Sequence, residues 1–199
     1  MVMRRRGLAC DGRGTSSVEF AAVAFVFLLA VLGVVDFGRA LWEWNAAAKA
    51  TQAGVRYAVV SDLAARNLRT LDGTRFAPIG MPVPAASVSP NPTVCAIEGC
   101  GPGLRTLDAA VLDATAFGRI VARMRAHDPR IGADNVVVEY RHVGLGLAGN
   151  PAGPDIDPVV TVRLRDMRFE FMALALLRLP PIEMPEFRAT LTGEDGRGV

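Results

Sequence analysis

The chain has 199 residues, and 51% of them are hydrophobic, which is enough for one membrane segment and one modest domain. The 22 Lys and Arg residues nearly balance the 20 Asp and Glu residues, so the net charge at neutral pH is only +2. Because the basic residues are spread along the chain, we expect no nucleic-acid-binding surface.

A basic leader precedes a long apolar run. Four arginines and one aspartate occupy residues 1–14, and no charged residue occurs from Phe20 to Val35. A membrane-spanning helix needs about 20 apolar residues, so this run is long enough only if Glu19 is tolerated at its edge. By the positive-inside rule, the N-terminus is expected to be cytoplasmic and the rest of the chain exported.

A cleaved secretory signal peptide is an alternative interpretation of this start. Ala46–Ala48 offers small residues for cleavage, but charged residues and two tryptophans, Trp42 and Trp44, lie between these alanines and the apolar run. Such a stretch is a poor cleavage region, and the tryptophans suit an interfacial belt at the outer membrane face. We interpret Asp36, at the end of the run, as a hydrated residue paired with Arg39 at i,i+3.

The helical pattern continues beyond the apolar run. Apolar and small residues recur every three or four positions from Leu41 to Ala58, and no proline interrupts residues 15–60. We predict one continuous helix of about 70 Å at 1.5 Å per residue, transmembrane over residues 15–38 and exported over residues 39–60. The charged residues expected to lie largely off the apolar stripe are Arg39, Glu43, Lys49 and Arg56.

The three cysteines fall on both sides of the apolar run. Cys10 precedes it, whereas Cys95 and Cys100 follow it. If the chain crosses a membrane between them, the later pair lies in an oxidising space and can form a disulfide, while Cys10 stays reduced. Half a metal site is the alternative, but no CxxC or HxxxH partner occurs, which favours the disulfide. We therefore expect no metal and no cofactor.

Residues 61–199 are predicted to form an exported domain. The Pro- and Gly-rich excursion at residues 76–103 argues against regular helix or central strand there. After it, apolar residues at helical spacing from Leu107 through Val111 to Met124 predict an amphipathic helix packed on a core.

The C-terminal part of the chain alternates as strands do. Three segments predict strands: NVVVEYRHV, DPVVTVRLRD and EFRATLTGED. Between the last two, RFEFMALALLRLPPIEMP indicates a strand followed by a short helix or loop, too short for a second membrane span. The fold class is thus α+β, with a long N-terminal transmembrane helix and an amphipathic helix packed on a small antiparallel sheet.

No pattern in the chain predicts catalysis. The GLGLAG motif at residues 144–149 fits G-x-G-x-x-G, but Pro151 and Pro154 follow it, so no helix N-terminus can hold a pyrophosphate. We interpret the motif as a hairpin connection. His127 and His142 are interpreted as surface groups, and an exported enzyme remains a hypothesis without a site. We expect no catalytic residue and no small-molecule substrate.

The stretch GRGTSSVEF, its apolar run and the following VVDFGRALWEWNAAAKATQAGVRYAV resemble the TadE-like minor pseudopilins of the tight-adherence (Flp-type) pilus system. The resemblance is closest over residues 12–60 and weaker towards the C-terminal ATLTGED. It implies that a prepilin peptidase cuts after Gly14, which makes Thr15 the new N-terminus and Glu19 its fifth residue. Phe20 follows, where pilin subunits often have tyrosine.

Glu19 can be explained chemically by the same cut. Cleavage exposes an α-amino group with a pKa near 8, which is mostly cationic at neutral pH. Thr15 and Glu19 are four residues apart and share a helix face, so the carboxylate could pair with its own amine or with that of a neighbouring subunit. Hydration of Glu19 at the headgroup level is the alternative.

We therefore expect a structural protein, not an enzyme, that supports pilus assembly as a minor pseudopilin. The resemblance implies as partners the prepilin peptidase, other pseudopilins and the assembly machinery of the inner membrane. The chain would be single-pass in that membrane, with a periplasmic C-terminal domain. An uncleaved, membrane-anchored periplasmic binding or scaffold protein is the alternative.

Overall fold

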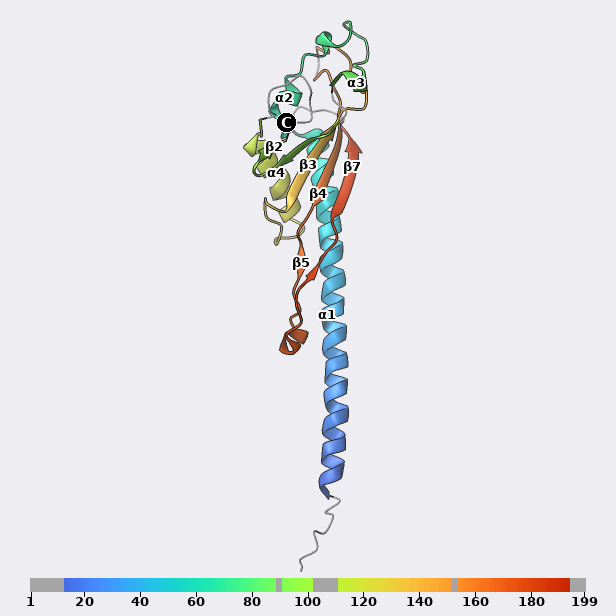
Figure 1. Ribbon diagram of the computed structural model, residues 1–199, viewed down its shortest axis with the longest axis vertical. Helices are drawn as coiled ribbons and strands as arrows, with labels where there is room; N and C mark the ends of the chain where they lie inside the picture. Colours follow the sequence, from blue (N-terminus) through green and yellow to red (C-terminus); the bar gives the residue numbers. More distant parts are fainter. Residues whose placement is uncertain (1–12, 89–90, 102–110, 152–153, 194–199) are drawn as a thin grey trace, which may run out of the picture. The chain divides into compact units, whose positions relative to one another are not determined.

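The structure is a computed structural model that describes residues 13–88, 91–101, 111–151 and 154–193. The chain forms two compact units, one of residues 1–41 with 170–181 and one of residues 42–169 with 182–199. Helix α1 (Arg13–Val60) contributes to both units (Figure 1). The predicted long N-terminal helix is thereby confirmed, since no proline or other break interrupts its hydrogen bonds.

Short elements follow α1 and lead into the sheet. They are the helices α2 (Arg66–Arg69), η1 (Gly73–Arg75) and α3 (Ala85–Val88), then the strands β1 (Thr93–Ala96) and β2 (Gly99–Cys100), and then the helix α4 (Ala114–Arg125). The remaining elements are β3 (Val136–Arg141), β4 (Val159–Leu164), β5 (Arg168–Phe169), η2 (Leu174–Leu177), β6 (Ile182–Glu183) and β7 (Phe187–Thr192).

Five strands form an antiparallel sheet in the order β2-β1-β3-β4-β7. Strand β4 shows the predicted alternation, because Val160, Val162 and Leu164 are buried while Thr161 and Arg163 are half-buried on the other face. The α+β fold class is confirmed. Strands β5 and β6 form a separate two-stranded ladder.

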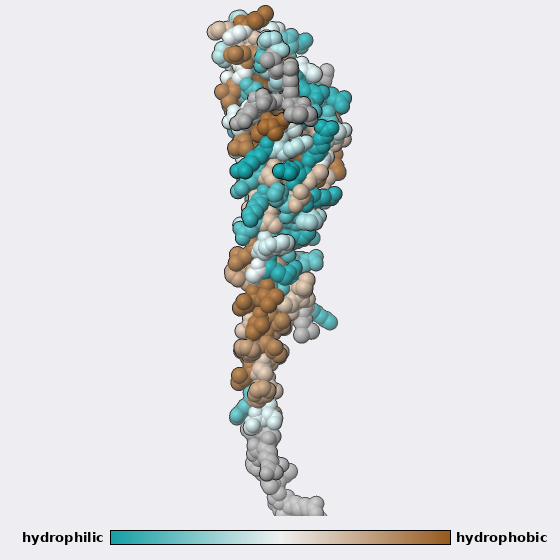
Figure 2. All heavy atoms as spheres, turned by 180° about the vertical axis from the view of Figure 1, so that it is seen from behind, coloured by the Kyte–Doolittle hydropathy of each residue, from teal (hydrophilic) through white to brown (hydrophobic). Residues whose placement is uncertain are grey.

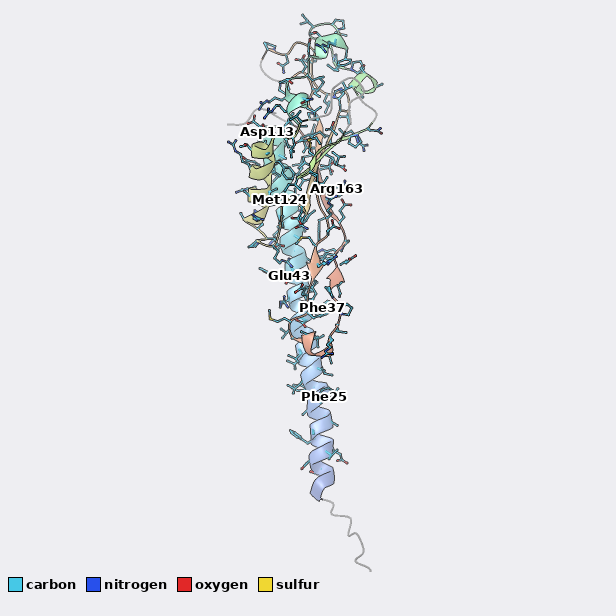
Figure 3. The ribbon with its side chains drawn as sticks, turned by 60° about the vertical axis from the view of Figure 1, so that its left-hand side comes forward. Phe25, Phe37, Glu43, Asp113, Met124 and Arg163 are labelled. Atoms are coloured by element: carbon cyan, nitrogen blue, oxygen red, sulfur yellow. A yellow bond between two sulfur atoms is a disulfide. The ribbon has the colours of Figure 1, made fainter. Side chains whose placement is uncertain are left out.

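Arg163 forms two ion pairs on the polar face of this sheet. Its guanidinium lies 2.7 Å from Glu139 of β3 and 3.0 Å from Glu186, which precedes β7 (Figure 3). Opposite charges on neighbouring strands stabilise the register of the ladder.

The other face of the sheet contributes to the hydrophobic core, where α1 and α4 pack closely. At Gly54 of α1, an added Cβ would lie 2.7 Å from Met124 Cγ of α4 and 3.5 Å from a Val162 methyl of β4. Glycine therefore permits this close approach of three elements. The principal buried side chains are Ala47, Ala50, Val55 and Ala58 of α1, Phe117, Ile120 and Met124 of α4, and Val136, Val138, Val160, Val162 and Leu164 of the sheet.

Helix α4 begins later than its apolar periodicity predicts. Asp113 caps it, because its Oδ1 accepts hydrogen bonds from Thr115 N at 3.0 Å and Ala116 N at 3.1 Å. The preceding backbone is engaged elsewhere, since Arg66 N donates to Val111 O at 3.0 Å. Val111 is therefore exposed and outside the helix, and Leu107 lies outside the described residues.

The Pro- and Gly-rich excursion at residues 76–103 supplies part of the sheet, so the expectation that it holds no central strand is wrong. Strand β1 lies between β2 and β3, and its Thr93 and Cys95 are buried. The prolines of the excursion lie before or after β1, and Thr93–Ala96 itself has none, so each residue of the strand retains its backbone donor.

The GLGLAG motif connects β3 and β4, which pair as antiparallel neighbours. The connection is tied to the excursion, since Ala148 N donates to Met81 O at 3.0 Å and Gly80 N donates to Ala148 O at 2.8 Å. At Gly146 the φ angle is +103° and an added Cβ would lie 2.5 Å from Asp155 O, so this position requires glycine.

His142 is buried, in contrast to the prediction of a surface group. Its Nε2 lies 3.0 Å from Val83 O, which can only accept, so Nε2 carries the proton. Its Nδ1 is buried and has no hydrogen-bond partner among the described residues, and burial lowers the pKa of His142. His127, by contrast, is exposed.

Candidate functional site

The N-terminal part of α1 has a largely apolar surface, with no charged residue from Phe20 to Val35. Within the described residues, α1 is the one helix that is long and apolar enough to cross a membrane. Figure 2 shows hydrophobic side chains gathered on it, and Figure 3 labels Phe25 and Phe37 among them. The exposed large apolar residues of this surface are Val18, Phe20, Val23, Phe25, Val26, Phe27, Leu28, Val31, Val34, Val35 and Phe37. Such a surface suits a membrane anchor.

The predicted processing residues lie at the start of α1. The helix begins at Arg13, so the bond between Gly14 and Thr15 lies in its first turn. This turn can open at low cost, because its N–H groups have no intrahelical acceptor and glycine weakens a helix by about 1 kcal/mol. Glu19 lies one turn after Thr15, and Glu19 and Phe20 are both exposed.

Asp36, at the other end of the apolar run, is buried in contacts with a distant segment. Its Oδ1 accepts hydrogen bonds from Met172 N at 3.2 Å and Ala173 N at 3.1 Å, and its Oδ2 accepts one from Leu174 N at 2.7 Å. The predicted contact with Arg39 is present at 3.4 Å, but Asp36 is only 1% exposed and is not hydrated. The signal that could have indicated this partner is a second apolar stretch, MALALL, later in the chain.

Glu43 is buried as well, although we predicted it off the apolar stripe. It pairs with Arg130, which also contacts Asp128 in a two-point arrangement, from Nε to Oδ1 at 3.0 Å and from Nη2 to Oδ2 at 2.8 Å. One guanidinium thus compensates two buried carboxylates. Trp44 contacts Phe187 edge-to-face, with ring centroids 4.9 Å apart, which fixes α1 against β7.

A groove between α1 and the end of α4 is lined by cationic side chains. The cations are Lys49, Arg56 and Arg123, which line it together with Tyr57 and His127, and no acidic residue is among the described residues that line it. Unlike Arg130, the Lys49, Arg56 and Arg123 side chains form no ion pair within the described residues. A concentration of positive charge of this kind favours the approach of anions.

A comparison with known protein families gives a match on the N-terminal part of α1. Residues 14–56 match the sequence model of TadE-like proteins. No curated protein and no solved structure gives a significant match. The match confirms the predicted resemblance for this part of the chain, which we call the TadE-like segment.

The TadE-like segment contains most of the residues described above. It begins at Gly14 and includes Glu19, the apolar surface, Asp36 and Glu43. The C-terminal ATLTGED, for which we predicted a weaker resemblance, lies outside it.

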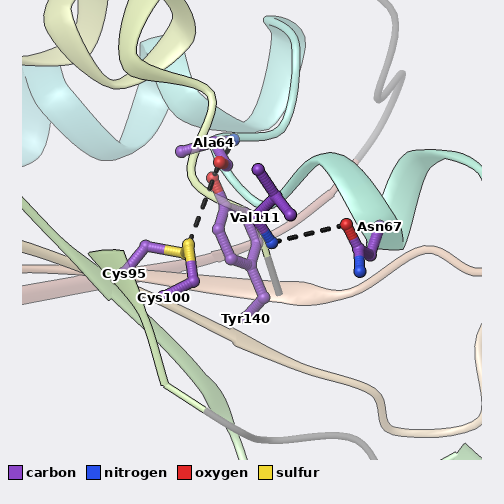
Figure 4. Close-up of a disulfide and its surroundings, with 6 residues drawn as sticks. All are labelled: Ala64, Asn67, Cys95, Cys100, Val111 and Tyr140. Atoms are coloured by element: carbon purple, nitrogen blue, oxygen red, sulfur yellow. Dashed lines mark hydrogen bonds between the residues drawn. A yellow bond between two sulfur atoms is a disulfide. The ribbon is translucent and has the colours of Figure 1, made fainter. Parts of the chain in front are cut away.

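Outside the TadE-like segment, the structure joins Cys95 and Cys100 by a disulfide. The two residues are directly opposite one another in the β1–β2 hairpin, so the bond fixes the register of this hairpin (Figure 4). Its Cys100 sulfur is 4.0 Å from Ala64 O, which is a contact only, because a bonded sulfur carries no proton.

Tyr140 links the segment that follows α1 to the sheet beside this disulfide. Its hydroxyl accepts a hydrogen bond from Ala64 N at 2.9 Å (Figure 4). Burial raises the pKa of Tyr140, so the hydroxyl stays neutral over the physiological range. Within the described residues, no group of His, Cys, Asp or Glu side chains could hold a metal ion.

Proposed function

We propose that this protein is a membrane-anchored structural subunit that supports assembly of a tight-adherence (Flp-type) pilus, in the manner of a minor pseudopilin. The observation that carries the proposal is the TadE-like match at residues 14–56, which falls on the exposed apolar surface of α1. In this proposal α1 spans the inner membrane, with the N-terminus in the cytoplasm and residues 61–199 in the periplasm.

Processing by a prepilin peptidase is the second part of the proposal. The peptidase cuts between Gly14 and Thr15, which removes the basic leader of residues 1–14. Support comes from the position of this bond in the first turn of α1 and from Glu19 and Phe20, exposed one turn later. The Cys95–Cys100 disulfide agrees with export of the residues after α1, because such bonds persist in oxidising compartments.

The test is the intact mass of the protein extracted from membranes after co-expression with a prepilin peptidase. The expected product begins at Thr15, and Gly14→Leu is expected to block its formation because a branched side chain hinders close approach to the backbone. Gly7→Leu, a matched change within the same leader, should be cut normally. A wild-type chain that keeps residues 1–14 would contradict processing and favour an uncleaved, membrane-anchored scaffold.

A further inference from the structure

The chain returns to the apolar part of α1 through residues 170–181, which we call the η2 loop. This loop and residues 1–41 belong to one compact unit. Asp36 holds the loop by hydrogen bonds from the three consecutive backbone N–H groups of Met172, Ala173 and Leu174. Arg39 adds a weaker bond, from Nη1 to Glu170 O at 3.4 Å. The loop is thus fastened where the uncharged run of α1 ends.

The buried Asp36 carboxylate explains why the loop is held there. A carboxylate at the edge of a hydrocarbon layer loses hydration, and that loss is costly unless other donors replace water. The three N–H groups of the η2 loop supply those donors, since Asp36 is only 1% exposed. Charge-assisted bonds of this kind are stronger than neutral ones, so they also fix the position of the loop.

Three large apolar side chains of the η2 loop are exposed, although the loop begins at an exposed acid, Glu170. Met172 is 71% exposed, Leu177 is 47% exposed and Leu179 is 44% exposed. Arg178, which is also exposed, lies between the two leucines in the left-handed conformation, with φ of 53°. Large apolar side chains next to a single arginine are typical of segments at a membrane interface, where the cation reaches the lipid headgroups.

We propose that the η2 loop is a second membrane-binding element, which inserts Met172, Leu177 and Leu179 into the outer leaflet beside α1. Arg178 lies at the level of the headgroups and contacts lipid phosphate. Asp36 is the positioning residue, because it fastens the loop at the membrane surface. This inference rests on the proposed function in one respect, namely that α1 spans the membrane.

Quenching by lipids tests the proposal on the full chain in lipid nanodiscs. Single cysteines for the fluorophore NBD are placed by Leu177→Cys in the η2 loop, Val26→Cys on the apolar surface of α1, and Ile79→Cys. Ile79 is a matched reference, since it is an exposed aliphatic residue in the other unit. All carry Cys10→Ser, and the Cys95–Cys100 disulfide stays intact. The nanodiscs contain phosphatidylcholine and phosphatidylglycerol, with or without doxyl-labelled lipid.

We expect doxyl lipid to quench the probe at position 177 several-fold more strongly than the probe at position 79, and iodide in the water to show the reverse order. The probe at position 26 should be quenched by doxyl groups deep in the bilayer. If position 177 behaves like position 79 while position 26 is quenched by lipid, the loop proposal is wrong and the membrane anchor stands. Absence of lipid quenching at position 26 would contradict the anchor itself.

Two further results test whether lipid or protein covers the η2 loop and whether Asp36 positions it. A probe at position 177 that is shielded from both quenchers would mean that protein, not lipid, covers the loop, which overturns the proposal. In the Leu177→Cys chain, Asp36→Ala should reduce lipid quenching at position 177 to the level seen at position 79. The same change should leave quenching at position 26 unchanged in the Val26→Cys chain. Undiminished quenching at position 177 would overturn the positioning role of Asp36.

Discussion

At the scale of single residues, Arg130 compensates two carboxylates that the fold removes from water. Its hydrogen bonds to Asp128, together with the charges of Asp128 and Glu43, raise the pKa of Arg130 above its ordinary value. The side chains of Glu43 and Asp128 are only 8% and 3% exposed. Loss of the guanidinium therefore removes the Arg130 charge from beside two buried acids, which is unfavourable.

We expect Arg130→Met to lower the free energy of unfolding by about 2–3 kcal/mol. The effect stays below that of a fully buried ion pair because the Arg130 side chain is 34% exposed. Arg130→Lys keeps the charge but loses the two-point contact with Asp128, so its cost should be intermediate. Urea unfolding in detergent micelles, followed by circular dichroism, measures both. Equal stability of wild type and Arg130→Met would contradict the role assigned to this residue.

His142 makes stability depend on pH. Because burial lowers its pKa in the folded state, the unfolded chain takes up a proton first as the pH falls. The contribution of neutral His142 is thus complete above the unfolded pKa of about 6.5 and is lost as the pH falls through the lower, folded pKa. His142→Gln can keep the donor to Val83 O without titrating, so it should flatten the loss of stability between pH 7.5 and 5.

The matched control for this measurement is His127→Gln. His127 is exposed, so this replacement should change the free energy of unfolding at pH 7.5 little, and it controls for the exchange of an imidazole for an amide. If the free energy of unfolding depends on pH equally in wild type and in His142→Gln, other groups cause the loss of stability in acid.

At the scale of elements, the sequence predicted the helices and strands that depend only on residues near one another along the chain. Strand β4 alternates between buried and half-buried residues as predicted, and α1 runs without a break because nothing in residues 13–60 stops a helix. The start of α4 was missed because the backbone before Asp113 pairs with residues that follow α1. The partner of Asp36 was missed for a similar reason, since Leu174 is 138 positions away along the chain. Contacts at such separations leave no periodic signal.

Two glycines lie in helices with different surroundings, so replacing each by alanine should affect the stability of the protein differently. At Gly118 of α4 an added Cβ meets nothing within 4 Å, so Gly118→Ala should raise the free energy of unfolding by about 0.5–1 kcal/mol through helix propensity. At Gly54 the Cβ would meet buried Met124, so Gly54→Ala should lower stability by up to about 2 kcal/mol. Denaturant midpoints of the two variants should therefore move in opposite directions. A shift in the same direction would contradict the close packing of α1 on α4.

At the scale of the whole molecule, the two acids at the ends of the apolar run differ in their partners. Asp36 is satisfied within the chain by the η2 loop. Glu19 is exposed on α1, so its counterpart in a membrane is water, its own new N-terminus or another molecule. In the proposed function, the partner is the α-amino group of Thr15 in a neighbouring subunit.

Glu19→Gln tests this pairing, because it keeps the size of the side chain and removes its charge. The apolar surface and the residues after α1 are unchanged, so abundance in the inner membrane should stay normal. Pilus output should fall by about tenfold if the pair contributes about 1.4 kcal/mol to assembly. Glu98→Gln removes an exposed carboxylate from the β1–β2 turn and serves as the matched control, with normal output expected.

The measurement is the number of surface pili beside membrane abundance and leader cleavage, for both variants and wild type. Normal output with Glu19→Gln would contradict the pairing. If output and cleavage are lost together, the change acts through recognition by the peptidase, and a chain that starts at Thr15 by another route separates the two effects. In that chain the amine exists without the peptidase, so a loss of pili with Glu19→Gln can come only from a step after cleavage, as the pairing requires.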